Sequence, residues 1–263
     1  MPLAASLFAV LFPDRCRLCE RVLRSFTPAP VCLDCLDSLR AAETSFTCRR
    51  CGLPFEVPAP LHGTEECGIC RLRVWEFDRA RAFGAYEGEL RRVIHLLKYD
   101  KMRPLARPLA ERMAARLPET GPADILIPVP LYRWRRWRRG FNQAEALASE
   151  LSRFSGVPCK RGVLRRTRPT RPQVGLSHRE RRLNLAGAFR VSSPRLVSGR
   201  RVLLVDDVMT TGATIDACAR ALKSAGASWV AGLTAARAKR RYIEISESSR
   251  KSVAFSGGGL KPQ

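Results

Sequence analysis

The segment that most constrains the fold of this chain is residues 202–214, which reads V-L-L-V-D-D-V-M-T-T-G-A-T. Its four leading apolar residues predict a buried strand, and the apolar residues that follow the segment recur at helical spacing: Ile215, Cys218, Ala219 and Leu222. Between strand and helix, backbone N–H groups, hydroxyls and the positive end of the helix dipole converge on one anion-sized space. The segment therefore predicts an α/β fold with a phosphate-binding turn.

Two neighbouring carboxylates beside a phosphate cradle suit a ligand that carries both a phosphate and vicinal hydroxyls, such as a ribose 5-phosphate. Gly212 permits the close backbone approach that a phosphate needs. The segment resembles the signature of type I phosphoribosyltransferases, in which the turn holds the 5′-phosphate of phosphoribosyl pyrophosphate and the acids bind the ribose hydroxyls. The resemblance implies these binding residues: Asp206, Asp207, Thr210, Thr211, Gly212, Ala213 and Thr214. The alternative is an unrelated strand-to-helix turn with a chance acid pair.

From Trp75 onward, strand-like and helix-like segments alternate, which favours a mostly parallel sheet with flanking helices. The pattern predicts a helix over 87–99, a strand over 125–131 and a helix over 142–154. We therefore expect a phosphoribosyltransferase-like α/β domain over residues 76–238, preceded by a small cysteine-rich module over residues 1–75.

Eight of the ten cysteines form four C-x-x-C pairs separated by 12, 12 and 15 residues, a spacing typical of structural zinc sites. The order of the pairs favours two closed four-cysteine zinc sites, although interleaved pairing and a disulfide framework remain alternatives. Four sulfur ligands leave no position for a catalytic water, so the metal is expected to stabilise the fold. The sites are expected to be Cys16, Cys19, Cys32 and Cys35, then Cys48, Cys51, Cys67 and Cys70.

The chain has a net charge of +23, and this charge is concentrated. Residues 133–182 hold 14 Arg and one Lys against three Glu, a net charge of +12. Such clustering favours binding of phosphates on a metabolite or a nucleic acid. A solvated arginine-rich surface without a ligand is the alternative.

Three further segments, 94–100, 128–145 and 173–189, together with the cysteine array, resemble the ComF family, which pairs a zinc module with a phosphoribosyltransferase fold. The resemblance extends to about Arg237. It places the loop after residue 131 at the pyrophosphate position, with Mg²⁺ on the pyrophosphate. Residues 165–182 are rich in Arg and Pro and too polar for a core, which favours a mobile cover over the ligand. The catalytic candidates are Arg138, Arg139, Arg179 and Arg182, with Lys98 and Tyr99 at the rim.

Two functions fit these features. The first is an enzyme that transfers ribose phosphate to an acceptor nitrogen, although the sequence identifies neither the acceptor nor a general base. The second is binding of single-stranded DNA during natural transformation, which the resemblance implies together with a helicase-like DNA-uptake motor as partner. Charge and stacking faces occur together in Arg133, Trp134, Arg135, Arg136 and Trp137, although both tryptophans could instead pack against the domain.

No apolar run approaches the ~20 residues of a membrane span. The apolar stretch 3–12 is short and lacks a positively charged start, which argues against a secretory signal and for a cytoplasmic protein. Residues 239–263 are rich in Ser and Gly and poor in apolar residues, so we expect a disordered tail.

Overall fold

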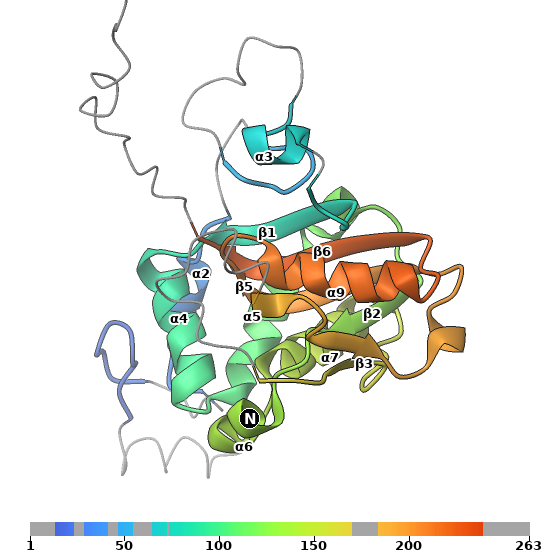
Figure 1. Cartoon of the computed structure of the whole chain (residues 1–263). Helices are drawn as coiled ribbons and strands as arrows, with labels where there is room; N and C mark the ends of the chain where they lie inside the picture. The colour runs from blue at the N-terminus through green and yellow to red at the C-terminus, as the bar shows by residue number, and fades with distance from the viewer. Residues whose placement is uncertain are drawn as a thin grey trace, which may run out of the picture.

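A computed structural model describes residues 14–23, 29–41, 47–54, 65–72, 74–169 and 184–238 of the chain (Figure 1). Its centre is a four-stranded sheet in which every neighbouring pair is parallel. The strands follow one another across the sheet in the order β1 (Arg79–Ala85), β6 (Trp229–Arg237), β5 (Arg201–Met209) and β2 (Ile125–Pro128). Parallel strands bring their carboxyl ends to one edge, so residues that follow β5 and β2 lie near each other.

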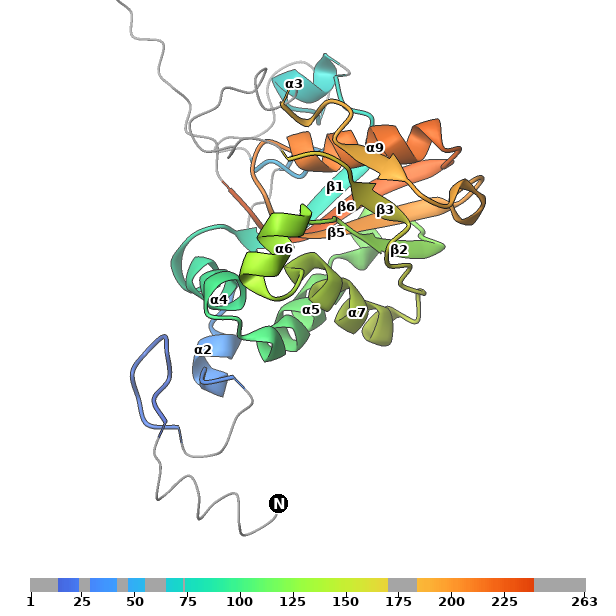
Figure 2. The same ribbon diagram turned by 60° about the horizontal axis from the view of Figure 1, so that its bottom comes forward.

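Helices cover both faces of this sheet (Figure 2). One face packs against α4 (Gly88–Tyr99), α5 (Ala106–Ala114) and α7 (Gln143–Ser155). The other face packs against α9 (Ala213–Ser224), which also contacts a separate antiparallel pair formed by β3 (Leu164–Arg166) and β4 (Phe189–Val191). The remaining elements are short: α2 (Leu33–Asp37), α3 (Gly68–Arg71), η1 (Arg103–Leu105), η2 (Leu117–Thr120), α6 (Arg133–Arg139) and η3 (Pro194–Leu196).

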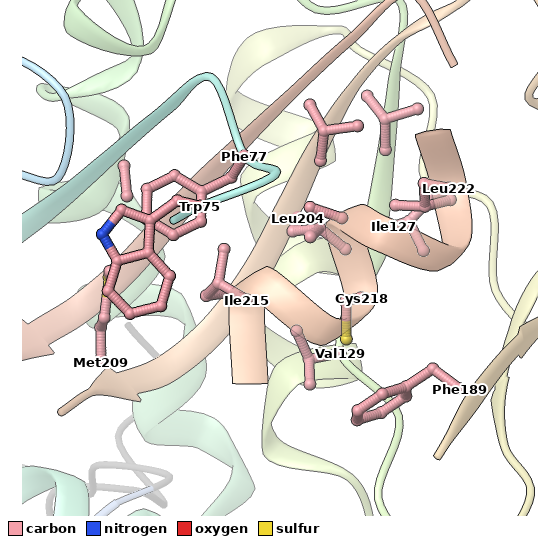
Figure 3. Close-up of a cluster of buried hydrophobic side chains, with 14 of the residues drawn as sticks. Trp75, Phe77, Ile127, Val129, Phe189, Leu204, Met209, Ile215, Cys218 and Leu222 are labelled. Carbon is pink, nitrogen blue, oxygen red and sulfur yellow. The ribbon is translucent and has the colours of Figure 1, made fainter. Parts of the chain in front are cut away.

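Burial on both faces explains the unbroken apolar run at the start of β5. Val202 and Leu204 belong to the core cluster beneath α9, part of which is drawn in Figure 3, whereas Leu203 and Val205 belong to the cluster beneath α4, α5 and α7. This alternation follows from the two-residue period of a strand. The sheet is thus the wall between two hydrophobic cores.

The predicted elements are present with small shifts. The predicted helices over 87–99 and 142–154 correspond to α4 and α7. The predicted strand over 125–131 ends earlier, at Pro128, although the Val129 N–H still donates to the Val205 carbonyl oxygen at 2.9 Å. Pro128 is the last residue of β2 that is in register with β5, opposite Val205, and Pro130 follows two residues later.

The two cysteine groups lie on opposite sides of the sheet. The first, which includes α2, packs into the cluster of α4 and α5, and the second, which includes α3, packs into the cluster of α9. Figure 2 shows α2 and α3 at opposite ends of the molecule. The cysteine-rich segment therefore contacts both cores of the α/β domain. Residues 1–13 and the expected tail at 239–263 lie outside the described residues.

Candidate functional site

The turn at residues 210–214, here called the TTGAT turn, joins the end of β5 to the start of α9. Gly212 is the N-cap of α9 with φ of 90°, a left-handed conformation that favours glycine. The Ala213 N–H reaches the Thr211 hydroxyl at 3.4 Å. Within the described ranges, the N–H groups of Thr211 and Gly212 donate no hydrogen bond to the protein. These amides can therefore receive an anion at a helix N-terminus.

The acid pair, Asp206 and Asp207, lies immediately before this turn, within the last residues of β5. Asp207 is buried and forms an ion pair with Lys98 of α4, with 2.9 Å between the lysine Nζ and the carboxylate Oδ1. Asp206 is partly exposed, and its Oδ1 accepts a hydrogen bond from the Asp207 N–H at 2.9 Å. One acid is therefore neutralised by the protein, and the other has no ion pair in the described part of the chain.

The electrostatics of the pair follow from this asymmetry. Although the residue as a whole is partly exposed, desolvation of its carboxyl group, reinforced by the charge of Asp207, raises the pKa of Asp206 to about 7, against the opposing effects of Lys98 and Arg166. Burial alone would lower the pKa of Lys98, but the Asp207 carboxylate outweighs it and raises that pKa. A carboxyl group with a pKa near 7 can accept a hydrogen bond from a ligand hydroxyl when it is ionised and donate one when it is protonated.

Helix α6 follows β2 and lies beside the end of α4. The Arg139 guanidinium lies 5.4 Å from the centroid of the Tyr99 ring, next to Lys98, and donates to the Gln143 Oε1 at 3.1 Å. Arg139 therefore contacts the last residue of α4, the helix that carries Lys98, whereas Arg138 is exposed and lies over Trp134 at 5.7 Å. Arg179 and Arg182 lie outside the described residues.

The remaining surface of α6 is exposed and aromatic. The exposed fraction is 56% for Trp134 and 81% for Trp137, so the alternative in which both tryptophans pack against the domain is wrong. Arg133 is exposed, and Arg136 forms an ion pair with Glu145 at 3.2 Å. Arg135 lies on the same helix. Two aromatic faces three residues apart, with arginines around them, form a surface to which unpaired bases can stack.

Each cysteine group fits one tetrahedral metal ion. All four sulfur atoms of a group lie within 4.8 Å of one another, in the sequential pairing that the spacing predicts. Sulfur–sulfur distances are 3.7 Å for Cys19 and Cys32 and 3.7 Å for Cys51 and Cys67. A tetrahedron with Zn–S bonds of about 2.3 Å has edges of about 3.8 Å, whereas a disulfide bond is about 2.05 Å long. The separations therefore match structural zinc.

The contacts of several residues at or near the site were not predicted from the sequence. Lys98 was expected only at the rim, yet it contacts the acid pair. The charge of Arg166, on β3 at the α9 side of the sheet, lowers the pKa of Asp206. Arg237 is buried beside Cys51. The β-strand alternation places Asp206 and Asp207 toward opposite faces, which is the one signal that could have suggested two different partners.

Comparisons with known proteins agree with these features. The family model for the phosphoribosyl transferase domain matches residues 137–254, and that for the double zinc ribbon domain matches residues 7–71. The chain is 37% identical to Competence protein F of Haemophilus influenzae, over 68% of this chain and 79% of that protein. It is 36% identical to the DNA utilization protein YhgH of Escherichia coli, over 83% of this chain and 94% of that protein.

Among solved structures, the chain is similar to glutamine phosphoribosylpyrophosphate amidotransferase from B. subtilis, at 24% identity with a TM-score of 0.34, over 49% of this chain and 26% of that one. Within the described residues, every helix is too short or too polar to cross a bilayer.

Proposed function

Because this chain belongs to the ComF family of competence and DNA-utilization proteins, we propose that it binds phosphoribosyl pyrophosphate at the TTGAT turn and single-stranded DNA at α6, in DNA uptake. The observation that carries the proposal is the juxtaposition of two uncommitted backbone amides, at Thr211 and Gly212, with an acid pair of which one member lacks an ion pair in the described ranges. Amides suit a phosphate, and carboxylates suit sugar hydroxyls.

Each group has a distinct role in the proposed complex. The TTGAT turn holds the 5′-phosphate, with Thr210 and Thr214 supplying hydroxyls and Ala213 starting the helix dipole. Asp206 and Asp207 hold the ribose hydroxyls, and Arg139 lies on the side where the pyrophosphate extends, with Arg138, Arg179 and Arg182 as further candidates. A Mg²⁺ ion bound with the ligand would neutralise part of the pyrophosphate charge.

Calorimetric titration with phosphoribosyl pyrophosphate and Mg²⁺ tests this site. The wild-type chain should bind one equivalent, and the variant with both Asp206→Asn and Asp207→Asn should bind about 10-fold or more weakly, because each lost charge-assisted hydrogen bond contributes about 1.5 kcal/mol or more. The matched control is Glu111→Gln with Asp14→Asn, which removes the same charge at exposed positions. Equal affinity of the wild type and the acid-pair variant would refute the site.

Binding of single-stranded DNA at α6 is supported by the exposure of Trp134 and Trp137. Stacking of one base on an aromatic side chain contributes about 1–3 kcal/mol, and phosphate contacts add a salt-dependent term. Trp137→Ala should therefore weaken binding of an oligothymidine strand about 5-fold or more without changing the salt slope. Charge reversal at Arg133, Arg136 and Arg138 should flatten the slope. Arg195→Glu, on exposed η3, is the control.

The enzymatic alternative keeps the same donor site and adds a transfer step to an acceptor nitrogen. Positioning of the two substrates could supply catalysis without a general base. A screen of nitrogenous bases for pyrophosphate release distinguishes an enzyme from a sensor, since a sensor binds the donor and releases none. A helicase-like DNA-uptake motor as partner remains part of the proposal and rests on the family alone, whereas the proposed cytoplasmic location rests on the short apolar stretch at residues 3–12, which lacks a positively charged start.

A further inference from the structure

A short stretch of chain, residues 74–78, connects the second cysteine group to β1, and we call it the strap. Arg50, which lies between Cys48 and Cys51, holds the strap through its carbonyl groups. The Arg50 guanidinium donates to the Trp75 carbonyl oxygen at 2.7 Å and to the Phe77 carbonyl oxygen at 3.1 and 3.2 Å. A residue of the second cysteine group therefore holds the strap in position.

The other side of the strap contacts the TTGAT turn and the first turn of α9. The Glu76 N–H donates to the buried Asp216 carboxylate of α9 at 2.7 Å. Phe77 is fully buried, and its ring lies 3.7 Å from the position that a Cβ atom on Gly212 would occupy. Figure 3 shows Trp75 and Phe77 close to Met209 and Ile215, which flank the turn. The strap therefore packs directly against the TTGAT turn and the first turn of α9.

A second link runs through Arg237 at the end of β6. Arg237 pairs in register with Met209 of β5, the residue whose Cε lies 2.8 Å from the same Cβ position on Gly212. The Arg237 side chain is buried, and its Nη2 donates to the Cys51 sulfur at 3.6 Å. In the described part of the chain, its Nε and Nη1 are buried without a hydrogen-bond partner.

A buried guanidinium needs a compensating anion, because an isolated buried charge costs several kcal/mol. Four thiolates around one divalent ion would carry a net charge of −2, and Cys51 is the sulfur that Arg237 contacts. The second cysteine group with its metal would therefore supply the anionic partner of the buried Arg237 guanidinium.

We propose that the metal-loaded second cysteine group, with Arg237 as its buried counter-ion, positions the TTGAT turn through the strap and Met209. The first cysteine group has no such role, because it packs against α4 and α5 in the core cluster on the opposite face, which includes neither the strap nor the turn. The inference concerns the order of the turn, and it rests on the proposed function only for the identity of the ligand that the turn receives.

Hydrogen exchange and elemental analysis, both on the full chain without ligand, test the inference. Arg237→Met should lower the zinc content from two ions per chain toward one and speed amide exchange over residues 209–216 by about 10-fold. Arg237→Lys keeps the positive charge, so it should retain more zinc and show slower amide exchange over residues 209–216 than Arg237→Met. The matched first-site variant, Cys19→Ser, should also lose one zinc ion but leave exchange in this segment unchanged. Unchanged zinc and exchange in Arg237→Met, or equal loosening by Cys19→Ser, would overturn the proposal.

Phe77→Leu keeps the inference falsifiable if the Arg237 variants do not fold. This change keeps an apolar side chain, although a smaller one, and leaves all eight cysteines in place, so both zinc ions should remain bound. Exchange at the Gly212 and Ala213 amides should nevertheless increase about 10-fold, because the ring contact beneath Gly212 is lost. If exchange there is unaffected, the strap does not position the turn. Failure of phosphoribosyl pyrophosphate to bind would sink the proposed function but would leave these results standing.

Discussion

Replacing Lys98 with methionine tests the electrostatic design of the acid pair. The substitution keeps the length of the side chain and removes its charge, so Asp207 remains buried without a counter-ion. The lysine Nζ and the carboxylate Oδ1 are 2.9 Å apart, and the two side chains are 13% and 12% exposed. We expect the variant to be less stable, because burial penalises a charge that has lost its partner.

The size of the effect follows from where the pair lies. Exposed ion pairs contribute about 0–1 kcal/mol, whereas removing one partner of a fully buried pair costs about 3–5 kcal/mol. A pair of small but measurable exposure falls between these limits, so Lys98→Met should lower the free energy of unfolding by about 2–3 kcal/mol. The Asp206 carboxyl should also become harder to ionise, because Lys98 is one of the charges that lower its pKa.

A double-mutant cycle in urea at pH 7.5 isolates the interaction. The four proteins are the wild type, Lys98→Met, Asp207→Asn and the double variant. Because Asp207→Asn removes the buried charge, the double variant should be more stable than Lys98→Met alone, with a coupling free energy of about 2 kcal/mol. A coupling below about 0.5 kcal/mol, the usual limit of additivity for independent sites, would refute the reasoning.

Three further results are expected. Burial raises the pKa of Asp206 from 3.8 to about 7, so ionisation of this carboxyl group destabilises the fold as pH rises from 4 to 7. Asp206→Asn removes this effect, so its free energy of unfolding relative to the wild type, measured in urea titrations, should increase by about 2–4 kcal/mol from pH 4 to pH 7 and stay constant above pH 7. Gly212→Ala, at φ of 90° and with Met209 Cε 2.8 Å from its new Cβ, should lower unfolding free energy by about 1–3 kcal/mol and weaken ligand binding in calorimetry. Elemental analysis should find two zinc ions per chain, and one or none would contradict the two closed sites.

Much of the fold was predictable because its signals are local. The buried strand, the TTGAT turn and the following helix each leave a pattern within a few residues, and the C-x-x-C spacing identifies metal ligands without knowledge of the fold. The predicted type I phosphoribosyltransferase fold and the two four-cysteine groups are confirmed by the family models and by the structure. The domain boundaries at 75 and 238 stay predictions.

The rest depended on contacts between distant residues. Lys98 and Asp207 are brought together by the packing of α4 on the sheet, and Arg237 lies 186 residues from Cys51. Neither pairing has a sequence signature, because a parallel sheet joins segments across long crossovers. The same holds for the cysteine groups, whose spacing is nearly uniform although they lie on opposite sides of the sheet. The exposure of Trp137 also required the fold, since a tryptophan at that spacing fits a core equally well.

The most direct test of the account compares two ligands that differ by one hydroxyl group. A chain with a net charge of +23 attracts any phosphate, so ribose 5-phosphate and 2-deoxyribose 5-phosphate, which carry the same charge, should be titrated at the same salt concentration. If the acid pair holds the sugar hydroxyls, the deoxy compound should bind about 10-fold to 100-fold more weakly. Equal affinities would mean that the acid pair does not hold the sugar, and would contradict the assignment of this edge of the sheet.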